Sequence, residues 1–184
     1  LANGLAKCWG ANGSGQLGNG TTNDASLPVA VSGVSGVVAV AAGADHSCAL
    51  LANGTVRCWG VNVLGELGNG TTANASTPVA VSGLSGAVAI ATGGFHSCAL
   101  LADGTVSCWG YNGSGQLGNG STANASLPVA VKSVSGAVAI AAGSNHSCAL
   151  LANGLAKCWG ANGSGQLGNG TTNDASLPVA VSDL

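Results

Sequence analysis

Cysteine is the residue of this chain whose type and spacing most clearly predict chemistry. Six of the 7 cysteines form couples that are ten residues apart. Two cysteines that face each other across antiparallel strands lie within disulfide distance. We therefore predict three disulfides: Cys48–Cys58, Cys98–Cys108 and Cys148–Cys158. Reduced structural thiols are one alternative, and zinc is another, although zinc favours Cys-x2–4-Cys clusters with further ligands nearby.

The elements that must position these cysteines recur every 50 residues, and Leu1 to Ser32 is repeated letter for letter as Leu151 to Ser182. Such a period is typical of one structural unit stacked against copies of itself. Short apolar runs separated by glycine-rich turns predict four strands in each unit, with no helix. In the unit from Ser35 to Ser82 the expected strands are Val37–Ala42, His46–Leu51, Thr55–Trp59 and Pro78–Val81.

Hairpin geometry supports the cysteine pairing. If Leu51 and Thr55 close a three-residue loop with Gly54 in the left-handed conformation, Cys48 falls opposite Cys58. Counting outward from the closing pair places both at a non-hydrogen-bonded position, where side chains approach most closely. Cys8 would need a partner ten residues before it, so we interpret it as a cysteine at a cut edge.

Histidine and tryptophan also recur once per unit. A catalytic or metal role for the histidines would need a neighbouring ligand or carboxylate, and only one of them has such a neighbour, Asp45. We therefore expect them to be structural and to hydrogen-bond a turn within their own unit: His46, His96 and His146. The tryptophans are expected to pack between units, with a carbohydrate-stacking ladder as the alternative: Trp9, Trp59, Trp109 and Trp159.

Asparagine forms an unusual number of glycosylation sequons, because 11 of the 16 asparagines lie in Asn-x-Ser/Thr. Sequons on exposed loops of a secreted protein can carry glycans. The first candidates recur in every unit on the loop between the third and fourth strands: Asn19, Asn69, Asn119 and Asn169. The remaining candidates are Asn12, Asn53, Asn74, Asn112, Asn124, Asn145 and Asn162.

Composition excludes several classes of function. A net charge of −2 with only 4 Lys and Arg provides no basic patch for nucleic acid or a membrane surface. The glycine-rich run Gly113–Gly120 lacks the Lys-Ser/Thr pair and following helix of a phosphate-binding loop. No Ser-His-Asp, Cys-His or paired-carboxylate pattern recurs. We therefore predict no enzymatic activity, no cofactor, no metal and no membrane insertion. The predicted disulfides indicate an extracellular or cell-surface location.

The consensus of the units resembles the repeat of the regulator of chromosome condensation family. The resemblance is carried by Gly93, His96, Ser97, Ala99, Leu100, Asp103, Gly104, Val106, Trp109, Gly110, Asn112, Gly115, Gln116, Leu117, Gly118 and Pro128. It implies an all-β fold in which each repeat supplies a four-stranded blade and seven blades close into a propeller. The nucleotide-exchange activity of the founding member is not implied, because its charged loops are missing here. The cysteine pairs and low charge look more like secreted bacterial relatives.

Blade counting predicts three complete blades and part of a fourth. The complete blades span residues 35–84, 85–134 and 135–184, and residues 1–34 contain only the last two strands of another. An unpaired apolar strand edge is a template for further pairing. We therefore expect the chain to be a window on a longer array or assembly.

Two functions follow from these patterns. The first is a non-catalytic extracellular structural protein that forms a fibre or surface appendage by blade-to-blade stacking, with further copies of itself as partner and covalent glycans as a further feature. The second is a secreted seven-bladed propeller that binds a protein or glycan, for which the secreted β-lactamase inhibitors of the family are a precedent. Near-identity of the units favours the first.

Overall fold

The computed structural model describes residues 4–183, and these residues form β-strands and turns without a helix. The all-β prediction is therefore confirmed. The strands are β1 (Lys7–Gly10), β2 (Ala25–Ala30), β3 (Val37–Ala42), β4 (His46–Leu51), β5 (Val56–Gly60), β6 (Ala75–Ala80), β7 (Ala87–Thr92), β8 (His96–Leu101), β9 (Val106–Gly110), β10 (Ala125–Ala130), β11 (Ala137–Ala142), β12 (His146–Leu151), β13 (Ala156–Gly160) and β14 (Ala175–Ala180).

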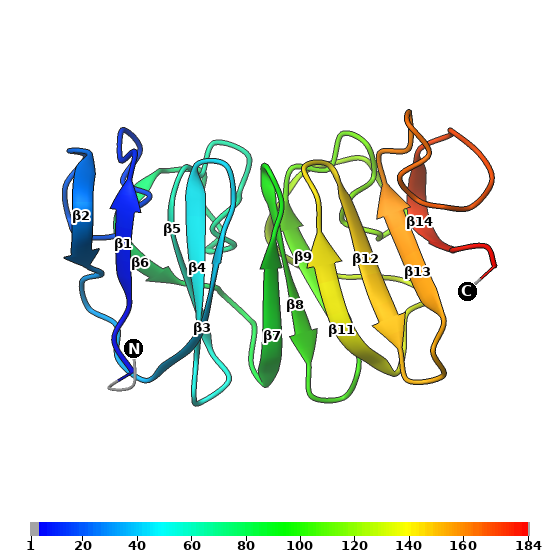
Figure 1. Cartoon of the computed structure of the whole chain (residues 1–184), viewed down its shortest axis with the longest axis horizontal. Coiled ribbons are helices and arrows are strands. Elements are labelled where there is room, and N and C mark those ends of the chain that lie inside the picture. The colour runs from blue at the N-terminus through cyan, green and yellow to red at the C-terminus, as the bar shows by residue number, and fades with distance from the viewer. Residues whose placement is uncertain (1–3, 184) are drawn as a thin grey trace.

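Neighbouring strands pair antiparallel in chain order. One two-stranded sheet, β1-β2, precedes three four-stranded sheets, β3 to β6, β7 to β10 and β11 to β14. Figure 1 shows these sheets one after another along the long axis of the molecule. The first strand β7 contacts the first strands of both neighbouring sheets, β3 and β11, so these three strands form the inner side of the stack, and β6, β10 and β14 are the opposite edges. This is the blade arrangement of a propeller.

In the unit for which bounds were predicted, the first two strands begin and end as expected, at Val37–Ala42 and His46–Leu51. The third strand is shifted by one residue, to Val56–Gly60, and the fourth begins three residues earlier and ends one residue earlier than predicted, at Ala75–Ala80. Pro78 therefore lies inside β6 rather than at its start. The strand tolerates this proline because β6 is an edge strand and its register against β5 shifts between Ala75 and Val79.

The central hairpin of each blade has the predicted register. The Leu51 N–H donates to the Thr55 carbonyl at 2.9 Å, and Gly54 adopts φ 76°. Cys48 pairs with Cys58, and their Cα atoms are 4.1 Å apart, as expected for a non-hydrogen-bonded position. Disulfides join all three predicted couples: Cys48–Cys58, Cys98–Cys108 and Cys148–Cys158.

The hydrophobic core lies between successive sheets. In the layer between the β3–β6 sheet and the β7–β10 sheet, Leu50 and Leu67 of one blade pack with Ala99 and Trp109 of the next. A Cβ added to Gly68 would come within 2.8 Å of the Trp109 ring, so the indole lies directly against the glycine backbone. The small side chains that dominate the composition are therefore what allows the blades to approach closely.

Candidate functional site

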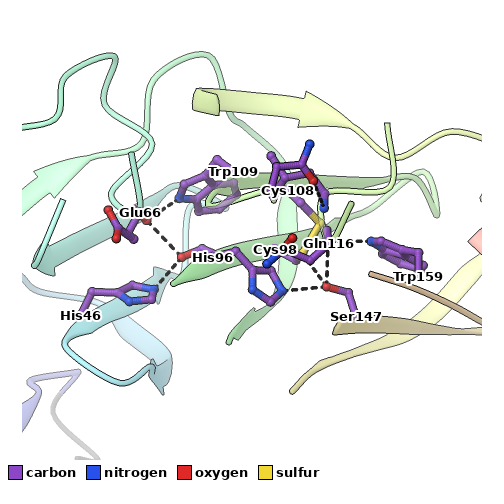
Figure 2. The surroundings of a disulfide bond; sticks show 12 residues. His46, Glu66, His96, Cys98, Cys108, Trp109, Gln116, Ser147 and Trp159 are labelled. Carbon is purple, nitrogen blue, oxygen red and sulfur yellow. Dashed lines mark hydrogen bonds between the residues drawn. A yellow bond between two sulfur atoms is a disulfide. The ribbon is translucent and has the colours of Figure 1, made fainter. Parts of the chain in front are cut away.

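In each of the first three repeats, one backbone carbonyl joins its sheet to the next. The Glu66 carbonyl accepts a hydrogen bond from Trp109 Nε1 at 2.8 Å (Figure 2). It also accepts one from Ser97 Oγ at 3.1 Å. Both donors belong to the following blade. The same pair of bonds recurs at the equivalent carbonyls, Gln16 with Trp59 and Ser47, and Gln116 with Trp159 and Ser147.

The histidines extend this bridge in the same direction. His46 Nε2 lies 2.9 Å from Ser97 Oγ, and His96 Nε2 lies 2.8 Å from Ser147 Oγ. Because the single hydroxyl hydrogen of Ser97 goes to the Glu66 carbonyl, Ser97 Oγ accepts from the Nε2–H of His46. The expectation that histidine bonds a turn within its own unit is therefore wrong for these two residues: each binds the next blade.

Burial keeps these two imidazoles neutral. His46 and His96 are 1% and 0% exposed, and burial lowers the pKa of each to about 4. The positive charges that His46 and His146 could carry lower the His96 pKa further. His146 is only partly buried, because it belongs to the last blade of the chain. The histidines are thus interface residues whose protonation opposes blade packing.

Three of the four tryptophans pack between blades, as the sequence predicts. Trp59, Trp109 and Trp159 are fully buried at 0% exposure, which leaves no ladder of rings for stacking sugars. Trp9 differs, with 63% of its surface exposed. It belongs to the partial sheet and has no preceding blade to pack against among the described residues 4–183.

Glu66 is the only acidic residue buried in this layer among the described residues. In the other repeats this position is glutamine, and Gln16 Nε2 donates to Asp45 Oδ1 at 3.3 Å. In this repeat the position equivalent to Asp45 is occupied by Phe95, whose side chain cannot accept a hydrogen bond from residue 66. Glu66 Oε2 accepts the Leu64 N–H at 2.8 Å, but Oε1 is buried without a partner. Burial raises the pKa of this carboxyl, although the Leu64 N–H acts against the shift.

We expect Glu66→Gln to stabilise the protein by about 1–2 kcal/mol at pH 8. Folding raises the pKa of the Glu66 carboxyl, so this group stabilises the folded state at pH values below the pKa of an exposed glutamate. That stability is lost as the pH rises through the pKa of the folded state. The gain should therefore shrink towards pH 4, which urea denaturation at both values will measure. Gln116→Glu is the matched control and should destabilise at pH 8; equal effects of E66Q at both pH values would contradict this explanation.

Three of the predicted glycosylation sites are inaccessible. Asn12, Asn112 and Asn162 are 0% exposed. Asn112 Nδ2, the atom that would carry a glycan, donates to the carbonyls of Ser121 and Ala123, both at 2.9 Å. Its Oδ1 accepts the Leu117 N–H at 2.9 Å. These asparagines therefore organise the loop between the third and fourth strands, and their selection as glycan acceptors is corrected.

The other sequons are reachable to different degrees. Asn53, Asn74 and Asn124 are exposed, and the first candidates on the loops are partly buried, as is Asn145: Asn19, Asn69, Asn119 and Asn169. Each loop asparagine accepts the N–H of the residue two positions later through Oδ1, as in the 3.0 Å bond from Thr71 to Asn69. Glycosylation at these positions remains a prediction.

The unpaired Cys8 lies on the open edge of β1. It is half-buried, and burial raises the pKa of its thiol. Two hollows of about 400 and 370 Å³ border this edge, where β1 faces Val40 of β3 and His46 of β4.

Within residues 4–183 no group of three or more His, Cys, Asp or Glu side chains is arranged to hold a metal ion. No helix in the same range is long and apolar enough to cross a membrane.

Comparisons with known proteins identify the repeat. The model of the regulator of chromosome condensation (RCC1) repeat matches residues 4–50, 53–100, 103–150 and 154–184, and a second RCC1 repeat model matches 37–66, 87–116 and 137–166. The chain belongs to the RCC1-repeat family. No curated protein sequence matches it.

Solved structures agree with this assignment. Yeast RCC1 (Prp20), in its complex with Kap60, is 26% identical over 98% of this chain with a TM-score of 0.85. Human WBSCR16 is 27% identical over 98% with a TM-score of 0.86. The chain covers 45% and 49% of these two proteins, so it spans about half their length. Its three and a half sheets therefore form a partial propeller, and its three disulfides indicate an oxidising environment.

Proposed function

We propose that this chain is part of a secreted RCC1-repeat propeller that serves as a non-catalytic binding scaffold. The observation that carries the proposal is the arrangement of the sheets. Three and a half sheets cover 45–49% of yeast RCC1 and human WBSCR16 at TM-scores of 0.85 and 0.86, so the same rotation continued would give about seven blades. A ring of that kind leaves no strand edge open.

The side chains available for function suit binding better than catalysis. His46 and His96 are buried and engaged with the next blade. By contrast, Val38, Val88 and Val138 on the inner strands are 61%, 55% and 56% exposed. Because β3, β7 and β11 are neighbours, these valines recur along one side of the stack and offer an apolar surface to a partner.

A fibre built by blade stacking is the second candidate. It is favoured by the recurrence of one interface, because a carbonyl, a tryptophan and a serine make the same bonds at three successive junctions. A polymer needs such an interface many times. Self-association, glycans and a cell-surface location belong with this candidate.

Electron microscopy of the material secreted by the native host, combined with its mass in solution, separates the two candidates. Discrete rings of one size would support the propeller scaffold. Filaments of variable length would support the fibre and overturn the scaffold. A reduced protein recovered from the cytosol would contradict secretion in either case.

A further inference from the structure

Several differences between the repeats gather where the β3–β6 sheet meets the β7–β10 sheet. The chain has 1 Phe and 1 Tyr, and both lie here: Phe95 precedes β8 and Tyr111 follows β9. The Tyr111 N–H donates to the Phe95 carbonyl at 2.8 Å, so the two residues are neighbours. The equivalents of Phe95 in the other blades are Asp45 and Asn145, and those of Tyr111 are alanine or valine. This junction therefore carries aromatic side chains that the others lack.

The preceding blade contributes a second set of unusual residues, Val63, Leu64 and Glu66. The other repeats have glycine, serine and glutamine at these positions. A Cβ added to Gly110 would lie 2.6 Å from the Phe95 carbonyl and 3.4 Å from Glu66 Cα, so the loop of one blade lies against the next blade here. Val63 and Phe95 are 61% and 39% exposed. We call the members that solvent reaches the Phe95 patch: Val63, Leu64, Phe95 and Tyr111.

A buried carboxylate oxygen without a partner borders this patch. Glu66 Oε2 accepts the Leu64 N–H at 2.8 Å, in the way that Gln16 Oε1 accepts a backbone N–H two residues earlier. Glu66 Oε1 therefore stands in the place of the amide Nε2, which in Gln16 donates to Asp45 Oδ1 at 3.3 Å. The residue that replaces Asp45 is Phe95, and Glu66 Oε1 has no hydrogen-bond partner.

A cation with N–H donors would satisfy this oxygen. An arginine guanidinium is the best match, because its planar fork of donors binds carboxylates and its face stacks on aromatic rings. The chain provides no such group at this place. Three of its 4 Lys and Arg lie at the beginning of third strands, whereas Tyr111 follows the end of one, and Lys132 lies beside Gly120. The three are Lys7, Arg57 and Lys157.

We propose that the Phe95 patch binds a protein partner through one exposed arginine, whose guanidinium stacks on the aromatic rings and donates to Glu66 Oε1. Apolar neighbours of that arginine pack on Val63 and Leu64. The proposal rests on the proposed binding role and adds the chemistry of a partner to it. The Phe95 side chain turns aside to admit the guanidinium, and such changes of rotamer are common when proteins bind one another.

The cost of Glu66 to the fold agrees with a role in binding. Glutamine at positions 16, 116 and 166 is compatible with the same loop, and glutamate leaves one oxygen of the free protein unsatisfied. Local rules of folding are broken most often at functional sites, where stability is exchanged for an interaction. The same substitution that stabilises the free chain, Glu66→Gln, is therefore expected to remove the preference for arginine.

The test titrates the full chain with the peptide acetyl-Leu-Arg-Leu amide at pH 8 and follows the backbone amides by NMR. We expect saturable shifts at Leu64 and Tyr111, with a Kd in the millimolar range or below, and no comparable shifts at Ser114 and Ala161 of the next junction. The matched control replaces arginine by citrulline, which has nearly the same shape without the charge. It should bind at least about tenfold more weakly.

Two variants separate the carboxylate from the aromatic ring. Glu66→Gln should bind both peptides equally. Phe95→Asn, which copies Asn145 and offers Oε1 a donor within the protein, should weaken the arginine peptide by about tenfold. Equal binding of the two peptides to the wild type, no saturable binding, shifts of the same size at Ser114, or an arginine preference that survives E66Q would each overturn the proposal. Discrete rings that show no arginine preference would keep the scaffold and reject only this site.

Discussion

Replacing Trp109 by alanine is expected to lower the free energy of unfolding by about 4 kcal/mol. The indole is fully buried between two blades, lies against Gly68 and donates its N–H to the Glu66 carbonyl at 2.8 Å. Truncation would leave a large cavity and a carbonyl with one donor fewer. Urea denaturation monitored by circular dichroism measures the loss.

Trp9→Ala is the matched control, because it is the same substitution at the same position of the repeat. Trp9 is 63% exposed, so its removal should change the free energy of unfolding by no more than about 0.5 kcal/mol. Equal losses for the two variants would show that the indole contributes through something other than packing between blades.

Acidification is expected to destabilise the protein well before its ordinary carboxylates are protonated. Burial lowers the pKa of His46 and His96 to about 4, against 6.5 for an exposed histidine. A lowered histidine pKa means that the unfolded chain binds protons first, so the stability present above pH 6.5 is lost as the pH falls towards 4. The expected loss is about 2 kcal/mol per histidine at pH 5.

The measurement is the free energy of unfolding between pH 7.5 and 4.5, for the wild type and for a variant with both His46→Gln and His96→Gln. The variant should be less stable at pH 7.5 but depend less on pH, because it has lost the groups that titrate. A double variant with an unchanged slope would contradict the role assigned to the two histidines.

The features of the fold that depend on local sequence could be predicted. Cys48 and Cys58 are joined by a short loop, so the loop length and Gly54 fixed their register before any tertiary contact was known. The strands Val37–Ala42 and His46–Leu51 begin and end as expected, because short apolar runs bounded by turn residues are also local signals. The fourth strand was harder, because a shift in register let it extend past Pro78.

The contacts between blades could not be predicted in the same way. His46 and Ser97 are 51 residues apart, and nothing near either residue in the sequence indicates that they meet. Glu66 Oε1 has no partner because two positions differ from the other units: glutamate replaces glutamine at 66, and Phe95 replaces the polar residue that lies opposite it. The structural role of Asn112 could have been predicted, because an asparagine recurs at this position in every unit. We interpreted Asn112 as a glycosylation site instead, because it also begins an Asn-x-Ser sequon.

The account depends most on the repeated junction at which a tryptophan of one blade donates to a carbonyl of the preceding one. Hydrogen exchange of the four indole N–H groups, followed by NMR, tests it directly. We expect slow exchange for Trp59, Trp109 and Trp159 and fast exchange for Trp9. Four indoles that exchange at similar rates would contradict the junction and the blade stacking that it supports.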